Sequence, residues 1–155
     1  MARTCSKEEQ YQLLVKQIAS LIDGEDDLIA VMSNVVAIIH QQMKFWWTGF
    51  YRVVGNELVL GPFQGPVACM HIPYGKGVCG TAWKQGQAIV VPDVEQFPGH
   101  IACSSESRSE IVVPVFDDNG KVMAVLDIDS DQLGTFDDTD RNYLEDICKM
   151  IRQAR

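Results

Sequence analysis

The sequence predicts an α+β fold, and three features of its pattern lead to this prediction. Apolar residues recur at helical spacing in two segments near the N-terminus and in one segment near the C-terminus. Between them lie short runs rich in β-branched and aromatic residues, separated by turn residues, which are typical of strands. Because the 155 residues contain no repeat, low-complexity tract or linker, we expect one domain over residues 1–155.

Capping residues and apolar stripes define the long helices. Ser6 and Glu9 have the spacing of a capping box, and the helix that they begin ends at Gly24. Asp26 or Asp27 caps a second helix, and a third begins near Asp137, whose acidic first turn suits the positive end of a helix. The apolar stripes are Tyr11, Leu14, Val15, Ile18, Leu21 and Ile22, then Leu28, Val31, Met32, Val35, Ile38 and Ile39, and finally Leu144, Ile147, Cys148 and Ile151.

The middle of the chain predicts strands, one short helix and one long loop. We expect the helix at Gly77–Gln85, and a hairpin turn at residues 117–120, which read Asp-Asp-Asn-Gly. Residues 92–107 have no periodicity, and a structureless stretch of that length is usually a functional loop. The expected strands are residues 46–54, 57–60, 67–72, 88–91, 110–116 and 122–128.

Composition excludes several classes of function. The net charge of −8 and the absence of a Lys/Arg run argue against nucleic-acid binding. No apolar stretch approaches the roughly 18–20 residues of a membrane span, and the N-terminus has no signal-peptide core, so we expect a cytoplasmic protein. In that reducing compartment five cysteines indicate thiol chemistry or metal binding rather than structural disulfides.

Thiols followed by acids form the most specific feature of the chain. Two of the acids are two residues apart on one expected strand and therefore share a face of it. A thiol that attacks and a carboxyl that supplies a proton together indicate redox chemistry at sulfur. The residues concerned are Cys69, Cys79 and Cys103, which lie in stretches rich in glycine and serine, and then Glu110, Asp127 and Asp129.

The order of elements resembles a GAF domain, and residues 75–83 (Gly-Lys-Gly-Val-Cys-Gly-Thr-Ala-Trp) resemble its central helix entry. The spacing of the three cysteines resembles the free methionine-(R)-sulfoxide reductases, as do Ser-Arg-Ser-Glu-Ile-Val-Val-Pro at 107–114, Leu-Asp-Ile-Asp-Ser at 126–130 and Trp-Trp-Thr-Gly-Phe-Tyr at 46–51. The resemblance covers residues 6–151. It implies a GAF-like fold: a central, mostly antiparallel sheet of about six strands, with the N- and C-terminal helices packed on one face.

The resemblance implies an enzyme that reduces free L-methionine-(R)-sulfoxide. We assign Cys103 as the attacking thiol, because it lies in the long loop shortly before Arg108 and can be accessible and near positive charge. The resulting sulfenic acid condenses with a second thiol. We favour Cys69, which we expect on a strand beside the site, and leave Cys79 open. No bound cofactor is implied, and the resemblance points to thioredoxin as the reductant of the disulfide.

The family also implies roles for the acids. Asp129 would bond the sulfoxide oxygen, while Glu110 and Asp127 would hold the ammonium group of a free amino acid. Crowded carboxyls raise at least one pKa, which keeps a proton available near neutral pH. Trp46 and Tyr51 are candidates for an apolar wall around the methyl-sulfinyl group, and a regular strand would turn Trp47 to the opposite face.

Other interpretations of the same residues, without catalysis, stay open. The cysteines and aromatic residues could simply pack, and the acids could line a solvated strand face. A zinc site could use His71 or His100 as its fourth ligand, although the thiols lack a close Cys-x-x-Cys pair. The alternative function is a non-enzymatic GAF module that binds a small ligand or senses redox state. GAF folds also pair through their terminal helices, so a homodimer is an expected assembly.

Overall fold

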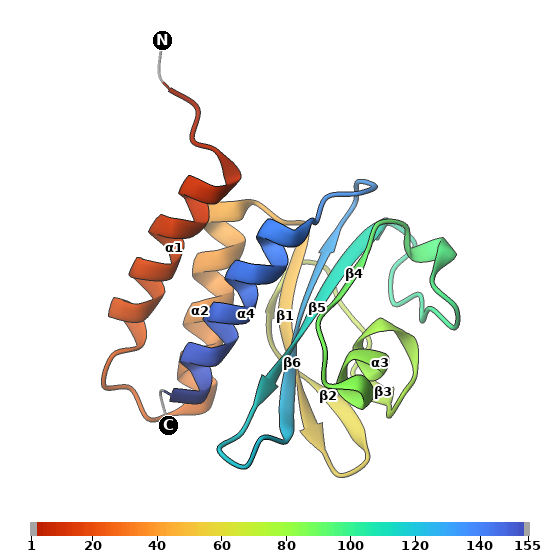
Figure 1. Ribbon diagram of the computed structural model, residues 1–155. Helices are drawn as coiled ribbons and strands as arrows, with labels where there is room; N and C mark the ends of the chain where they lie inside the picture. Colours follow the sequence, from red (N-terminus) through yellow and green to blue (C-terminus); the bar gives the residue numbers. More distant parts are fainter. Residues whose placement is uncertain (1–2, 154–155) are drawn as a thin grey trace.

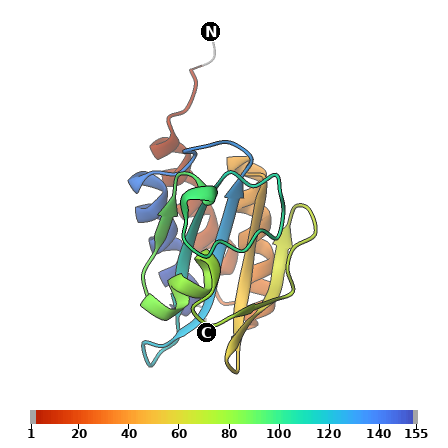
Figure 2. The same cartoon turned by 90° about the vertical axis from the view of Figure 1, so that its right-hand side faces the viewer.

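A six-stranded sheet separates a layer of long helices from a layer of loops and one short helix (Figure 1). The computed structural model describes residues 3–153. One face of the sheet carries α1 (Lys7–Ile22), α2 (Leu28–Met43) and α4 (Asp138–Gln153). The other face is covered by α3 (Gly77–Gln85) and by the segment 92–108 (Figure 2). The expected fold, with the terminal helices together on one face, is confirmed.

Every neighbouring pair of strands in this sheet is antiparallel. The spatial order is β3-β2-β1-β6-β5-β4, so the long strands lie in the middle and the short ones at the edges. The bounds are β1 (Trp47–Val54), β2 (Glu57–Gln64), β3 (His71–Pro73), β4 (Ile89–Val91), β5 (Ser109–Phe116) and β6 (Val122–Ser130). A single-turn 3-10 helix, η1 (Val94–Gln96), interrupts the loop that precedes β5.

Alternation along the central strands sorts side chains between two apolar cores. Phe50, Ile111 and Leu126 face the helical layer, where they pack with the apolar stripes of α1, α2 and α4. Val112 and Val125 face the side of α3. By the same alternation Glu110, Asp127 and Asp129 leave the sheet on the α3 side, which fixes the position of the acids.

Capping side chains begin the helices where the sequence predicts. Ser6 accepts a hydrogen bond from the amide of Glu9, and Asp27 rather than Asp26 caps α2. The buried Asp140 ties α1 to α4, because it accepts hydrogen bonds from Tyr11 Oη (2.6 Å) and from Lys7 Nζ (2.7 Å). Within residues 3–153, no helix combines the length and the apolar character that crossing a bilayer requires.

Two strand predictions are corrected by the structure. The strand expected at residues 67–72 is only β3, and residues 65–70 form a loop that begins at Gly65 (φ +129°). Cys69 therefore lies in a loop and not on a strand. Conversely, β2 continues to Gln64 past Pro62, because the register between β1 and β2 shifts there and the missing amide of proline breaks no ladder bond.

Candidate active site

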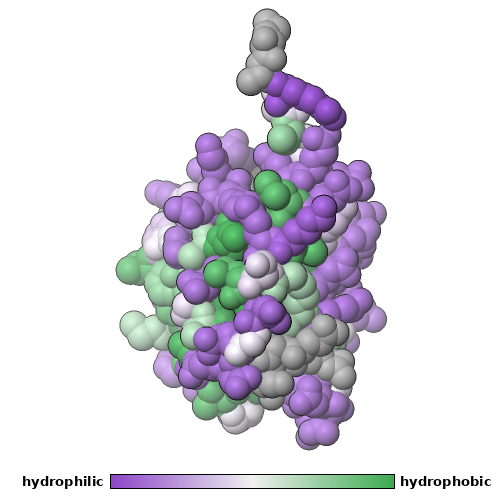
Figure 3. Space-filling view, turned by 90° about the vertical axis from the view of Figure 1, so that its left-hand side faces the viewer, coloured by the Kyte–Doolittle hydropathy of each residue, from purple (hydrophilic) through white to green (hydrophobic). Residues whose placement is uncertain are grey.

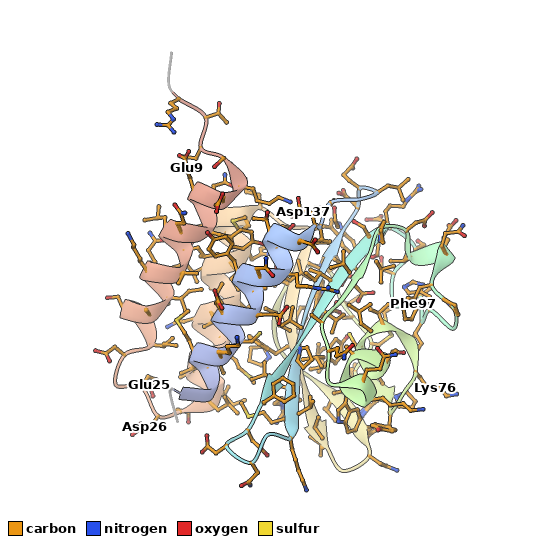
Figure 4. The ribbon with its side chains drawn as sticks, in the orientation of Figure 1. Glu9, Glu25, Asp26, Lys76, Phe97 and Asp137 are labelled. Carbon is orange, nitrogen blue, oxygen red and sulfur yellow. A yellow bond between two sulfur atoms is a disulfide. The ribbon has the colours of Figure 1, made fainter. Side chains whose placement is uncertain are left out.

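A small cavity of about 50 Å³ opens on the α3 side of the sheet. Its walls come from β1, β5 and β6, from the start of α3, and from the two loops at 65–70 and 92–108. Phe97 of the second loop and Lys76, which precedes α3, are labelled in Figure 4 and lie on the side of the sheet away from the long helices. The residues predicted from sequence that line the cavity are Trp46, Tyr51, Cys79, Cys103, Glu110, Asp127 and Asp129.

A disulfide joins Cys69 to Cys103 at the edge of this cavity. The two Cα atoms are 5.3 Å apart, and the cysteines are 34 positions apart in the sequence. The bond links the loop at 65–70 to the long loop before β5. The pairing is the one favoured from sequence, although the reason given for it, a strand position for Cys69, is wrong.

Two aromatic side chains of β1 hold the loop that carries Cys69. Tyr51 Oη donates a hydrogen bond to the carbonyl oxygen of Cys69 (2.9 Å), and Trp47 Nε1 donates one to the carbonyl oxygen of Pro66 (2.9 Å). Burial, with the nearby Asp127 charge, raises the pKa of Tyr51 above its usual value, so its hydroxyl remains a donor. These bonds fix the Cys69 backbone next to the cavity, a role that periodicity could not reveal.

Three carboxyl groups form the acidic end of the cavity. Glu110 and Asp127 are buried, with 6% and 5% of their surface exposed, and Glu110 lies directly across the β5–β6 ladder from Asp129. Burial, reinforced by the charges of the neighbouring acids, raises the pKa of all three well above the usual range. Ser107 Oγ donates a hydrogen bond to Asp129 Oδ1 (3.1 Å). The cluster can therefore store protons near neutral pH and bind a cation when it ionises.

Cys79 is a second thiol beside these acids. It is the third residue of α3 and is 4% exposed. Burial raises its pKa well above the usual value, and the charge of Asp127 adds to the shift, so Cys79 is held as a neutral thiol and is a poor nucleophile. The possible zinc ligand His71 lies elsewhere: it is exposed and contacts Glu57 Oε1 (3.0 Å).

The aromatic wall of the cavity contains one residue that the sequence assigned to the wrong face. Trp47 lines the cavity with Trp46 and Tyr51, and its ring stacks on that of Tyr51 with the centroids 6.0 Å apart. Trp47 and Tyr51 are four residues apart on β1 and so share a face. Because β1 begins at Trp47, Trp46 lies before the strand and is free of its alternation.

The long loop supplies further lining residues, and one expected neighbour is absent. His100, Ile101 and Ser104 flank Cys103 and line the cavity, which their position in the aperiodic loop could have suggested. Arg108, in contrast, is exposed and does not line it. The groups that face Cys103 across the cavity are therefore acids that carry protons, and not the expected cation.

The chain matches the model of the GAF domain over residues 27–154. It is 41% identical to the free methionine-R-sulfoxide reductase of Saccharomyces cerevisiae, across 96% of this chain and 87% of that protein. The structure of the Neisseria meningitidis free methionine-R-sulfoxide reductase with its substrate superposes with a TM-score of 0.95, at 46% identity over 99% of this chain and 93% of that one. Reduced fRMsr of Staphylococcus aureus gives a TM-score of 0.91, at 49% identity over 99% of both chains.

Fold and site together define a GAF domain that carries a disulfide-bonded pair of cysteines beside a buried acidic cluster. Within that class, the chain belongs to the free methionine-R-sulfoxide reductase family.

The raised pKa values predict how stability depends on pH. A carboxyl with a raised pKa binds more protons folded than unfolded, so the free energy of unfolding falls as pH rises above about 4, where unfolded carboxyls ionise. Each unit of pKa shift corresponds to about 1.4 kcal/mol. Asp127→Asn should flatten this slope. The free energy of unfolding of the variant minus that of the wild type should therefore be larger at pH ~8 than at pH ~5, by about 1 kcal/mol or more.

Urea denaturation of the disulfide form at the two pH values measures this effect. The matched control is Asp131→Asn, which changes an exposed acid just beyond β6 and should leave the slope as in the wild type. An equal slope in Asp127→Asn and the wild type would contradict the assignment of strained, protonated acids to this cavity.

Proposed function

We propose that this protein reduces free L-methionine-(R)-sulfoxide to L-methionine. The observation that carries the proposal is the Cys69–Cys103 disulfide at the edge of a cavity whose other end holds three carboxyls of raised pKa. Sulfoxide reduction needs a sulfur nucleophile and a proton for the oxygen, and this cavity offers both.

Cys103 is the attacking thiol in this proposal. Its thiolate attacks the sulfoxide sulfur, the oxygen takes up a proton, and transfer of that oxygen leaves methionine and a Cys103 sulfenic acid. The Cys69 thiol then displaces water from the sulfenic acid and forms the disulfide present in the structure. Cys79 is a weaker candidate for this second thiol, because its sulfur is buried against Asp127.

The acids divide the binding of the substrate between them. Asp129 carries the proton for the sulfoxide oxygen, and Ser107 orients its carboxyl. Glu110 and Asp127 accept hydrogen bonds from the substrate ammonium, whose positive charge draws their protons off. Trp46, Trp47 and Tyr51 surround the methyl-sulfinyl end. Because the acids that bind the ammonium are buried, the nitrogen cannot carry a peptide chain.

A defined mixture of R- and S-sulfoxides, with dithiothreitol as reductant, tests the activity. The wild type should consume only the R isomer and produce methionine, and Cys103→Ser should lower the rate by at least about 1,000-fold, because the nucleophile is lost. Cys5→Ser, which removes an exposed free thiol, is the control and should keep full activity. N-acetylated and peptide-bound sulfoxides should be poor substrates.

Two results would contradict the proposal. Activity that survives Cys103→Ser would move the nucleophile to another cysteine, and equal rates on free and peptide-bound sulfoxide would refute the ammonium pocket. Without reductant, one turnover should consume two free thiols. A non-enzymatic GAF module that binds the sulfoxide as a ligand would consume none.

Thioredoxin is the reductant that we propose for the disulfide, and the cytoplasm, a reducing compartment, is the location that we propose for the reaction. The bond is only partly buried, and the exposed apolar side chains Val67 (88%) and Met70 (69%) flank Cys69. An attacking thiolate carried by a protein partner can approach the bond over this surface, with apolar contact on both sides of Cys69.

Charged substitutions beside Cys69 should separate protein reductants from small ones. Met70→Asp should raise the apparent KM for thioredoxin about tenfold, or ~1.4 kcal/mol, because the contact would bury an unpaired charge. The rate with dithiothreitol should stay unchanged. Val54→Asp changes an exposed valine in the β1–β2 hairpin and should alter neither assay. Equal losses with both reductants would contradict docking at Met70.

A homodimer formed through the helical layer is also part of this proposal. Figure 3 shows apolar side chains gathered among charged ones on this face. Leu13 and Leu21 of α1 are 55% and 44% exposed, and Ile29 of α2 is 45% exposed. Sedimentation velocity should therefore give the mass of two chains. Leu13→Asp with Leu21→Asp should shift the protein to one chain, and a monomeric wild type would refute this assembly.

A further inference from the structure

We propose that the acidic end of the cavity is also a binding site for a borderline-soft divalent cation such as Zn²⁺. Cys79 Sγ and one carboxylate oxygen each from Glu110 and Asp127 would be its ligands. The bound ion would inhibit the enzyme by occupying the place of the substrate ammonium. The inhibition rests on the proposed function, whereas the binding of the ion does not.

The three ligand atoms already lie close together. They are all within 4.8 Å of one another and come from three separate elements, α3, β5 and β6. Tetrahedral zinc with bonds of 2.0–2.3 Å places its ligand atoms roughly 3.3–3.8 Å apart. Side-chain rotations that draw the three atoms together by roughly 1 to 1.5 Å at most therefore complete three positions of a tetrahedron.

One oxygen in the cluster has no partner. Asp127 Oδ1 is buried and makes no hydrogen bond, although its residue is only 5% exposed. A buried acceptor without a donor costs free energy, and a cation bound to it would recover that cost. Of the residues that the structure describes around the cavity, none is a lysine or an arginine that could supply the positive charge.

The sulfur distinguishes a metal site from an ammonium site. An ammonium group needs oxygen acceptors, and a thiol sulfur is only a weak acceptor. A thiolate and carboxylate oxygens are, however, all ligands that zinc accepts. Cys79 is 4% exposed and lies at ligand distance from both acids, so it offers a soft donor that amino-acid binding does not require.

The size of the cavity in the disulfide form also suits an ion. About 50 Å³ holds a cation with a few water molecules, since one water needs roughly 10–15 Å³ by the same measure. A water can therefore take the fourth coordination position, as in zinc sites with an open position. The ion can bind while Cys69 and Cys103 are locked in their disulfide, and binding displaces to solvent the proton of Cys79 and the protons held by the Glu110 and Asp127 carboxyls.

The oxidised protein gives the most direct test, because its disulfide removes Cys69 and Cys103 as ligands. Titration with Co²⁺ should produce the visible bands of tetrahedral cobalt and a thiolate-to-cobalt charge-transfer band, and Zn²⁺ should displace both. Cys79→Ser should abolish the charge-transfer band and weaken Zn²⁺ binding by at least about 100-fold, since even second-shell changes cost 10–100-fold. Cys5→Ser and Cys148→Ser, which remove the other free thiols, should bind as the wild type does.

A second variant guards against a folding defect in Cys79→Ser. Asp127→Asn keeps the thiol but neutralises a ligand, and it should weaken Zn²⁺ binding while the protein still unfolds cooperatively. No cobalt charge-transfer band in the wild type, or an unchanged band in Cys79→Ser, would overturn the site.

The reduced enzyme tests the consequence for activity. Zn²⁺ should inhibit competitively against methionine sulfoxide, and the fractional inhibition should disappear in Cys79→Ser at the same ion concentration. Inhibition that persists in this variant would place the ion on Cys69 and Cys103 and would refute the inhibitory role of the acidic site. Because the cobalt titration requires no turnover, its failure is distinguishable from failure of the proposed reductase activity.

Discussion

The crowding of three carboxyl groups on one side of two central strands is the constraint on which the site depends. The register of β5 against β6 sets Glu110 opposite Asp129, and the period of a strand sets Asp127 on the same face. Charged acids so close together and so buried would repel one another and lose their hydration. Burial and mutual repulsion raise the pKa values of these acids and so favour their protonated forms, and a carboxyl that holds its proton is the kind of group that can supply one to a sulfoxide oxygen.

Three acids stay this close together only if the strands that carry them are held rigidly. The helical layer supplies that support, because α1, α2 and α4 bury a continuous apolar core against the far face of the same strands. Asp140, buried and bonded to Tyr11 and Lys7, shows how differently this half treats an acid: each oxygen has a donor, and one donor is a cation. The acids of the cavity have no such cation. The helical layer therefore satisfies its buried acid with donors, whereas the α3 side of the sheet leaves its acids available to a ligand.

Periodicity and capping predicted most of the fold, and strand parity predicted the shared face of the acids. The errors occur where the backbone departs from a regular period. Cys69 was placed on a strand because residues 67–72 are mostly apolar, but Gly65 and Pro66 turn the chain into a loop held by bonds from Tyr51 and Trp47. Trp47 was assigned to the wrong face because alternation was counted from Trp46, which precedes β1, and not from Tyr51, which shares a face with Trp47. Long-range contacts decided the position of Cys69, and no local pattern encodes them.

The disulfide has a consequence for the protein in its cell. It ties together two loops through cysteines that are 34 positions apart in the sequence, and both loops line one small cavity. After one turnover, the nucleophilic sulfur of a molecule therefore remains in the disulfide, and the two loops remain joined, until an external reductant cleaves the bond. The fraction of molecules in this locked state then measures the supply of oxidised amino acid against the supply of reductant. The fraction of this enzyme in the disulfide form therefore reports the oxidative load on the cell.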